Sequence, residues 1–299
     1  MERPADVVGI ILHFRTPLMT GAALESLRAE GVPRAVLVDN SEDDGRSLAS
    51  MHAALARLES QGLRIDLVRP GRNLGFAAGV SAGLTAMLAG PGRHALLLNS
   101  DAILQPGSLA AMCQLLERHG LIVPRICRGR GMPPSSAFDY YQPATAIISR
   151  TRLPGRSIAV PSGCCQLIHR DLLLPDLFDS EFFFYCEDIM LAYQLGRRQV
   201  SVTECQDALV THAVSASARK GSLFYEYHIA RAHWLLGSKL ARGFGEKTLY
   251  QLIRCLVLPA RALLRAVRLR SWAPLRGLCM ATNDALHGHC RPLTPAPED

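Results

Sequence analysis

Apolar and amphipathic segments alternate through the first 120 residues of the chain. Apolar, strand-like runs lie at 6–14, 34–41, 63–70 and 94–102, and helix-like segments lie at 20–30, 46–60, 71–88 and 106–119. Strands of a parallel sheet that are buried on both faces have this apolar pattern. Their alternation with helices predicts an α/β fold, with a mostly parallel sheet flanked by helices on both faces.

The remainder of the chain changes character twice. Residues 121–160 are rich in Pro, Gly and Arg, which predicts a long loop region with short antiparallel strands around 140–149. Compact structure is expected to resume over 161–215, and the chain beyond 222 is predicted to be wholly helical. No internal repeat is visible.

The composition narrows the class of protein. With 299 residues, 48% of them hydrophobic and 20% charged, the chain can bury a substantial core and is not globally disordered. The net charge of +7 favours an anionic partner, such as nucleic acid, anionic lipid or a phosphorylated small molecule. Because no RNA-recognition or helix-turn-helix pattern accompanies the charge, no nucleic acid is expected.

The cysteines and the lengths of the apolar runs indicate in which cellular compartment the protein is located. The nine cysteines are scattered, without the paired C-x-x-C motifs of a zinc site, so neither disulfides nor structural zinc are expected. The start, "MERPADVVGIILHF", lacks a basic segment before its apolar run, which predicts that there is no signal peptide. No apolar run reaches the roughly 18 residues of a spanning helix. These features predict a cytoplasmic protein.

Polar side chains end two of the predicted strands, at the sheet edge where ligands of such folds bind. Asp39 either accepts hydrogen bonds from a ribose or base, or is a turn acid. Asn99, Ser100 and Asp101 offer oxygen ligands that suit Mg²⁺ or Mn²⁺ on a diphosphate, with a turn role as the alternative. Two polar strand ends on one edge favour a shared site.

The glycine-rich stretch "RNLGFAAGVSAG", residues 72–83, is a second candidate for anion binding. Gly75 would let the backbone approach a phosphate at the start of a helix. Gly79 and Gly83 are better explained by close packing of that helix on the sheet. The stretch lacks the spacing of the usual mononucleotide and dinucleotide motifs.

An aromatic run, Phe182 to Tyr185, precedes two adjacent acids, Glu187 and Asp188, at the start of a predicted helix. Helix N-termini favour acids, so capping is one interpretation. The other is that the aromatic surroundings desolvate a carboxylate and make it a general base. His212 follows an apolar strand and is a metal ligand, a phosphate contact or a buried core histidine.

Five segments, taken in order, resemble the family 2 glycosyltransferases of the Rossmann-like GT-A fold, especially their rhamnosyltransferase-like branch. These segments are "VDNSEDDG", "RNLGFAAGVSAG", "LLLNSDA", "FDSEFFFYCEDIMLAYQLGRRQ" and "ALVTHAVSAS". The resemblance runs from about residue 6 to 235. It implies a GT-A catalytic domain over 1–235 and a helical, basic C-terminal extension over 236–299.

The resemblance also implies an activity. It is that of an inverting, metal-dependent hexosyltransferase, which moves a rhamnose-like or other hexose from a nucleotide diphosphate to a hydroxyl of a glycan or lipid-linked acceptor. Such enzymes act in cell-surface polysaccharide or glycolipid synthesis. Asp188 matches the catalytic base with Glu187 as its support, and Asp101 and His212 match the ligands of Mg²⁺ or Mn²⁺. The implied donor-binding residues are Asp39, Asn40, Arg72, Asn73, Gly75, Phe76 and Asn99.

Three positions depart from the pattern of the family. Asn99-Ser100-Asp101 carries one carboxylate where relatives have two, which implies weaker metal binding. Gly163 is followed by Cys164 where relatives often have a second glycine, and Met190 stands where an acid is common. The last two departures bear on the fit of the acceptor.

The segment 247–277 contains no acid, and arginines recur among Leu, Val and Trp272: Arg254, Arg261, Arg265, Arg268, Arg270 and Arg276. A helix of this kind either lies on an anionic membrane surface with its arginines at the headgroups, or packs on the catalytic domain with a solvated basic face. The first interpretation places the protein at the inner face of the cell membrane. Pro259 is expected to kink or split this helix.

A non-catalytic nucleotide-sugar-binding module is the alternative function. Such a module would bind a nucleotide sugar at the same donor site but would not transfer the sugar to an acceptor. Neither the donor sugar nor the acceptor has a local sequence motif here.

Overall fold

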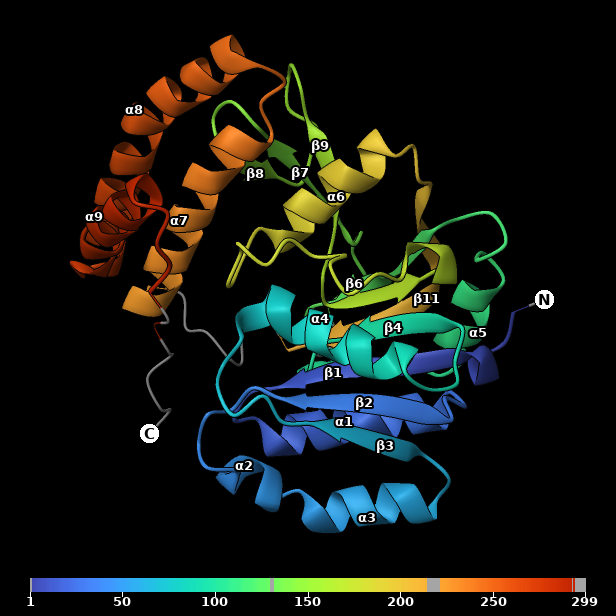
Figure 1. Ribbon diagram of the computed structural model, residues 1–299. Coiled ribbons are helices and arrows are strands. Elements are labelled where there is room, and N and C mark those ends of the chain that lie inside the picture. The colour runs from blue at the N-terminus through green and yellow to red at the C-terminus, as the bar shows by residue number, and fades with distance from the viewer. Residues whose placement is uncertain (1, 130–131, 214–220, 292, 294–299) are drawn as a thin grey trace.

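The computed structural model describes residues 2–129, 132–213, 221–291 and 293. Its centre is an eight-stranded sheet with the order β3-β2-β1-β4-β10-β6-β11-β5 (Figure 1). The strands are β1 (Val7–His13), β2 (Arg34–Asp39), β3 (Arg64–Val68), β4 (His94–Leu98), β5 (Ala102–Leu104), β6 (Leu121–Cys127), β10 (Cys165–Ile168) and β11 (Val202–His212). Parallel pairing joins β3-β2-β1-β4 and β6-β11, whereas β10 and β5 run antiparallel to their neighbours. The predicted α/β fold is confirmed.

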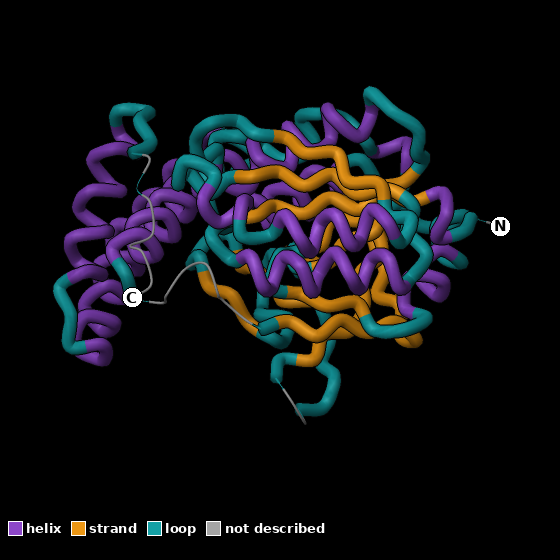
Figure 2. The backbone as a smooth tube through the Cα atoms, turned by 90° about the horizontal axis from the view of Figure 1, so that it is seen from below, coloured by secondary structure: helices purple, strands orange, loops and turns teal. Residues whose placement is uncertain are grey.

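Helices cover both faces of this sheet. The chain advances from β1 to β3 toward one edge, then returns through α4 to pair β4 on the other side of β1. Because such crossovers are right-handed, α4 lies on the face opposite α1 and α3. Figure 2 shows the helices over the strands and a separate group of helices beside the sheet. The helices are α1 (Pro17–Ala29), α2 (Arg46–Ala49), α3 (His52–Ser60), α4 (Gly75–Leu88), α5 (Ser108–Cys113), α6 (Glu187–Arg197), α7 (Leu223–Lys239), α8 (Phe244–Leu269) and α9 (Ala273–Leu286), with short 3₁₀ turns at Pro4–Asp6 and Arg170–Leu172.

Residues 121–160 hold more regular structure than predicted. The antiparallel strands expected around 140–149 are present as β7 (Phe138–Gln142) and β8 (Ile147–Ser149), which form a second sheet with β9 (Ile158–Pro161). The expectation of a loop is wrong for β6, which lies in the middle of the main sheet with Leu121, Ile122 and Val123 buried. Pro124 made this strand hard to predict, and the register of β11 shifts just beyond it, between Cys205 and Leu209.

Three predicted helices differ in extent. The helix expected over 20–30 begins at Pro17, a favourable first residue of a helix because its fixed φ suits that position. The segment 46–60 forms two helices, α2 and α3, and the segment 106–119 forms only the short α5. The amphipathic pattern located these helices but not their ends.

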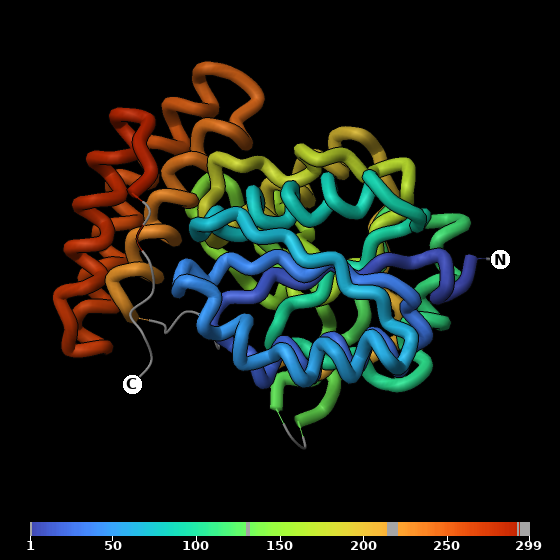
Figure 3. Tube along the Cα trace, turned by 60° about the horizontal axis from the view of Figure 1, so that its bottom comes forward, coloured from blue at the N-terminus to red at the C-terminus, as the bar shows by residue number. Residues whose placement is uncertain are grey.

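The C-terminal helices form a group beside the carboxyl ends of β1 and β2, away from the N-terminus (Figures 1 and 3). The described chain beyond 222 is helical, as predicted, and α7 packs against both α8 and α9. The domain boundary predicted at 235/236 falls inside α7. Helix α8 runs through Pro259 without a break, so the predicted split is wrong, whereas the predicted kink stays a prediction. No helix of the described residues is long and apolar enough to cross a membrane.

Candidate active site

A cavity opens at the carboxyl ends of β1, β2 and β4, the edge that the strand order predicts for ligands. The ends of these three strands and the start of α4 meet there. Its lining residues are Leu12, Phe14, Asn40, Asn73, Gly75, Phe76, Asn99, Ser100, Asp101, Phe184 and Phe224. Five of the seven predicted donor-binding residues line this cavity, and so does Asp101.

Asp101 and His212 lie in direct contact. His212 Nε2 is 3.1 Å from Asp101 Oδ1. The antiparallel pairing of β5 with β11 brings them together, because it places His212 opposite Ala102, the residue after Asp101. No cluster of three or more His, Cys, Asp or Glu side chains suited to a metal exists within the described ranges. Asp101 and His212 alone are too few to hold a metal ion, so a cation bound here would have to take its remaining ligands from a diphosphate.

The loop that begins α4 is tied to β2 and to the aromatic run. Asn40 Nδ2 donates to the Gly75 carbonyl at 2.9 Å, and Asn73 Oδ1 accepts from the Gly75 N–H at 2.9 Å. Gly75 has φ +75°, and a Cβ on it would lie 2.2 Å from the Phe183 carbonyl oxygen. Gly75 lines the cavity, and because it has no side chain the backbone at Phe183 can pack directly against it.

The other two glycines of this stretch have the packing role that was predicted. A Cβ at Gly79 would come within 2.7 Å of Leu12, and one at Gly83 within 2.7 Å of Ile10. Both leucine and isoleucine belong to β1, so the glycines let α4 lie close on the sheet.

Asp39 and Arg72 do not line the cavity. Asp39 Oδ1 accepts from the Ser41 N–H at 3.1 Å, which is the turn role that the sequence left open. Arg72 is exposed. Donor contacts of both residues stay predictions.

The aromatic run separates the first cavity from a second one. Tyr185 and Cys186 have φ of +69° and +66°, a backbone conformation that is costly for residues with side chains. This turn places Phe184 in the first cavity and Tyr185 in the second, with their ring centroids 4.5 Å apart. The second cavity is lined by Asp139, Ile148, Val160, Ser162, Tyr185, Cys186, Asp188, Ile189 and Ile229.

Glu187 and Asp188 begin α6, and both residues are half-buried. Asp188 Oδ1 accepts from the Ile189 N–H at 2.8 Å, whereas Glu187 Oε2 is buried and has no hydrogen-bond partner among the described residues. Burial raises the pKa of both carboxyls. The neighbouring charge of Asp188 raises the pKa of Glu187 further, and that of Asp139 does the same for Asp188. A carboxyl whose pKa is raised in this way is better able to accept a proton than an ordinary surface acid.

Several lining residues escaped the sequence analysis. Phe224 at the start of α7 contacts Phe184, with ring centroids 5.3 Å apart. Asp139 and Ser162 reach the second cavity from the small sheet. None of these residues belongs to a recognisable motif, and only the fold brings them to the site.

Five of the nine cysteines are buried, and Cys255, Cys279 and Cys290 are exposed. All nine lie in the described part of the chain, and none forms a disulfide there. Burial raises the pKa of Cys164 to about 11, so its thiol stays protonated at neutral pH. The end of the "ALVTHAVSAS" segment, residues 214–217, lies outside the described residues.

Comparisons with known proteins agree with this geometry. The model of the family described as "Glycosyltransferase like family 2" matches residues 13–237. No curated protein has a significantly similar sequence.

Similar folds occur among solved structures. The crystal structure of GalNAc-T7 with UDP, GalNAc and Mn²⁺ has a TM-score of 0.57 and 13% identity, covering 83% of this chain and 54% of that one. The chain therefore spans about half the length of GalNAc-T7. The structure of S. aureus TarS 1-349 in complex with UDP has a TM-score of 0.51 and 14% identity, covering 95% of this chain and 92% of that one. At these identities the likeness shows the fold, and the predicted GT-A fold is confirmed.

The family model covers most of the chain, including both cavities' principal acids, Asp101 and Asp188. Its match is independent of the low-identity structural likeness. The chain belongs to glycosyltransferase family 2, and it is a glycosyltransferase of the GT-A fold.

Proposed function

We propose that this chain transfers a rhamnose-like or other hexose from a nucleotide diphosphate to a hydroxyl of a glycan or lipid-linked acceptor, with inversion at the anomeric carbon. The reaction would serve cell-surface polysaccharide or glycolipid synthesis, as in the rhamnosyltransferase-like branch. One observation carries the proposal: two cavities adjoin at Phe184 and Tyr185, one with Asp101 and His212 nearby and the other with Asp188.

The first cavity is the proposed donor site. UDP is present in the TarS and GalNAc-T7 structures, and Mn²⁺ in the latter, which supports a nucleotide donor and a divalent cation. Asp101 and His212 would hold Mg²⁺ or Mn²⁺, which neutralises charge on the diphosphate when bound. Asn73, Phe76 and Asn99 line the space for the donor. Asn40 also lines it while holding the Gly75 loop in place.

The second cavity is the proposed acceptor site. Asp188, in its carboxylate form, would accept the proton of the acceptor hydroxyl as that oxygen bonds to the anomeric carbon. The bond from this carbon to the diphosphate oxygen breaks at the same time, and the nucleoside diphosphate leaves with the electron pair. A single displacement of this kind inverts the anomeric centre. Glu187 would support the start of α6 beside the base.

Replacing the proposed base tests the assignment. We expect Asp188→Asn to lower transfer by about 10²- to 10⁴-fold, because the amide cannot accept the proton, while donor binding remains. Asp176→Asn, an exposed aspartate outside both cavities, is the matched control. A panel of nucleotide sugars, each with Mn²⁺ or with EDTA, would be screened for a rise in melting temperature and for transfer to acceptor glycans.

The outcomes separate the alternatives. Equal transfer by Asp188→Asn and Asp176→Asn would remove Asp188 as the base. A donor that raises the melting temperature without transfer or hydrolysis above background would identify a non-catalytic binding module. An unchanged thermal shift in EDTA would refute the role of a cation at Asp101 and His212.

A further inference from the structure

The outer face of α8 is apolar. Its residues Leu249, Leu252, Leu256, Leu263, Leu264 and Val267 are each more than half exposed. Their spacing of mostly three, four or seven residues places them along one side of the helix. Phe244, the first residue of α8, and Trp272, just beyond its end, are also exposed, by 86% and 75%. We call these eight residues the α8 stripe.

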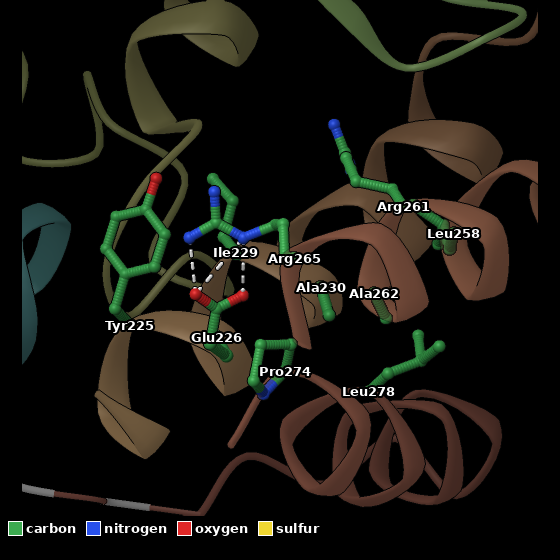
Figure 4. Close-up of a pocket in the computed structure, with 10 residues that line it drawn as sticks. All are labelled: Tyr225, Glu226, Ile229, Ala230, Leu258, Arg261, Ala262, Arg265, Pro274 and Leu278. Atoms are coloured by element: carbon green, nitrogen blue, oxygen red, sulfur yellow. Dashed lines mark hydrogen bonds and ion pairs between the residues drawn. The ribbon is translucent and has the colours of Figure 1, made fainter. Parts of the chain in front are cut away.

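The inner face of α8 holds arginines that were expected at a membrane surface. Arg254 is fully buried, and Arg261 donates to the Ala146 carbonyl at 3.2 Å. Arg265 pairs with the buried Glu226 across a cavity between α7, α8 and α9 (Figure 4), with Nε 3.0 Å from Oε2. The prediction that the arginines lie at the headgroups is therefore wrong for these three, because the packing of α7 and α8 needs their hydrogen bonds.

Every exposed charged residue in the segment 242–291 is positive. Residues 242–291 contain nine Lys or Arg and two acids, so this segment accounts for the whole net charge of +7. Neither acid is exposed: Glu246 is half-buried beside Arg156, and Asp284 is buried against Arg291. The exposed cations closest to the stripe in sequence are Arg242, Lys247, Arg268, Arg270 and Arg276. Arg291 is also exposed, but it pairs with Asp284.

We propose that the α8 stripe lies in the surface of an anionic lipid bilayer, with these five cations at the headgroups. An apolar helix face bordered by cations without exposed acids is the pattern of helices that bind in the plane of a membrane. Helix α8 cannot cross the bilayer, in agreement with the finding that no described helix has the properties of a span. A second copy of this chain fits less well, since two such positive faces would repel each other.

This inference adds a location to the proposed function and does not depend on it. Helix α8 packs on α7, and Phe224 at the start of α7 lines the first cavity. If the acceptor is lipid-linked, which rests on the proposed function, binding through α8 would hold the site beside its acceptor. Vesicle binding tests the location, and transfer to a water-soluble acceptor tests the function separately.

The test is co-sedimentation of the full chain with phosphatidylcholine vesicles, with and without phosphatidylglycerol. We expect binding only when phosphatidylglycerol is present, together with a blue shift in fluorescence that the Trp272→Phe variant loses. Leu256→Glu/Leu264→Glu should bind at least about tenfold more weakly, because it removes apolar contact from the middle of the stripe. Arg268→Gln/Arg270→Gln should lose roughly fivefold for each arginine.

Leu18→Glu/Leu88→Glu is the matched control. It adds the same charge at two exposed leucines on α1 and α4. The proposal fails if this control weakens vesicle binding as much as the α8 variant does, or if neutral vesicles bind equally well. It also fails if the chain ignores vesicles and forms a dimer that Leu256→Glu/Leu264→Glu converts to a monomer in light scattering, because a second copy then covers the stripe.

Discussion

At the scale of single residues, Glu187 and Asp188 stand in unequal surroundings although they are adjacent. Asp188 Oδ1 has the Ile189 N–H to stabilise its charge, and Glu187 Oε2 has no hydrogen-bond partner within the described chain. Burial raises the pKa of both, and the charge of Asp188 adds to the shift of Glu187. Glu187 is therefore the acid whose ionisation costs the fold more.

Replacing Glu187 should make stability less dependent on pH. A carboxyl whose pKa is higher in the folded chain than in the unfolded chain binds more protons when the chain is folded. The free energy of unfolding of the protein therefore falls as the pH rises between these two pKa values. We expect Glu187→Gln to match the wild type near pH 5 and to exceed it by roughly 1–2 kcal/mol at pH 9. Urea denaturation at several pH values measures this, with the exposed Glu59→Gln as control. A difference that stays constant with pH would contradict it.

At the scale of elements, the start of α4 and the segment before α6 are held together through backbone. The Phe76 N–H donates to the Phe183 carbonyl at 2.7 Å, beside Gly75. This hydrogen bond links the walls of the two cavities, since Phe76 lines the first cavity and Phe183 is two residues before Tyr185, which lines the second.

A comparison of two glycines with the same φ measures how much this contact constrains the residue at position 75. Gly75 and Gly71 both have φ +75°, but only Gly75 faces another segment, with the Phe183 carbonyl 2.2 Å from the position of a Cβ. We expect Gly71→Ala to cost about 1–2 kcal/mol, the penalty of a left-handed alanine, and Gly75→Ala to cost at least about 2 kcal/mol more. Urea denaturation of the two variants checks this, and equal losses would show that the loop moves away freely.

At the scale of the whole molecule, the buried guanidinium group of Arg254 joins the C-terminal helices to the second sheet. Arg254 of α8 donates from Nε to the His233 carbonyl of α7 at 2.8 Å and from Nη2 to the Pro143 carbonyl, next to β7, also at 2.8 Å. A third bond runs from Nη2 to the Tyr141 hydroxyl at 3.3 Å. The arginine thus connects α8, α7 and the second sheet.

Removing Arg254 should destabilise this junction. We expect Arg254→Ala to lower the free energy of unfolding by about 2–4 kcal/mol, because it leaves several buried carbonyls without donors. Arg268→Ala, at an exposed position of the same helix, should change it by less than about 0.5 kcal/mol. Denaturation followed by circular dichroism compares the two, and a similar loss in both would mean that Arg254 has no special part in the junction.

The sequence by itself determined the strand–helix alternation, the ligand edge of the sheet and the acids at the start of α6, because periodicity and strand-end chemistry are local. The tertiary structure decided the rest. Only long-range packing put β6 into the main sheet despite Pro124, placed His212 beside Asp101, and brought Asp139 to Asp188. It also turned Arg254, Arg261 and Arg265 inward and left leucines on the surface of α8, because buried backbone carbonyls and Glu226 needed hydrogen-bond donors that a count of charges along the chain does not reveal.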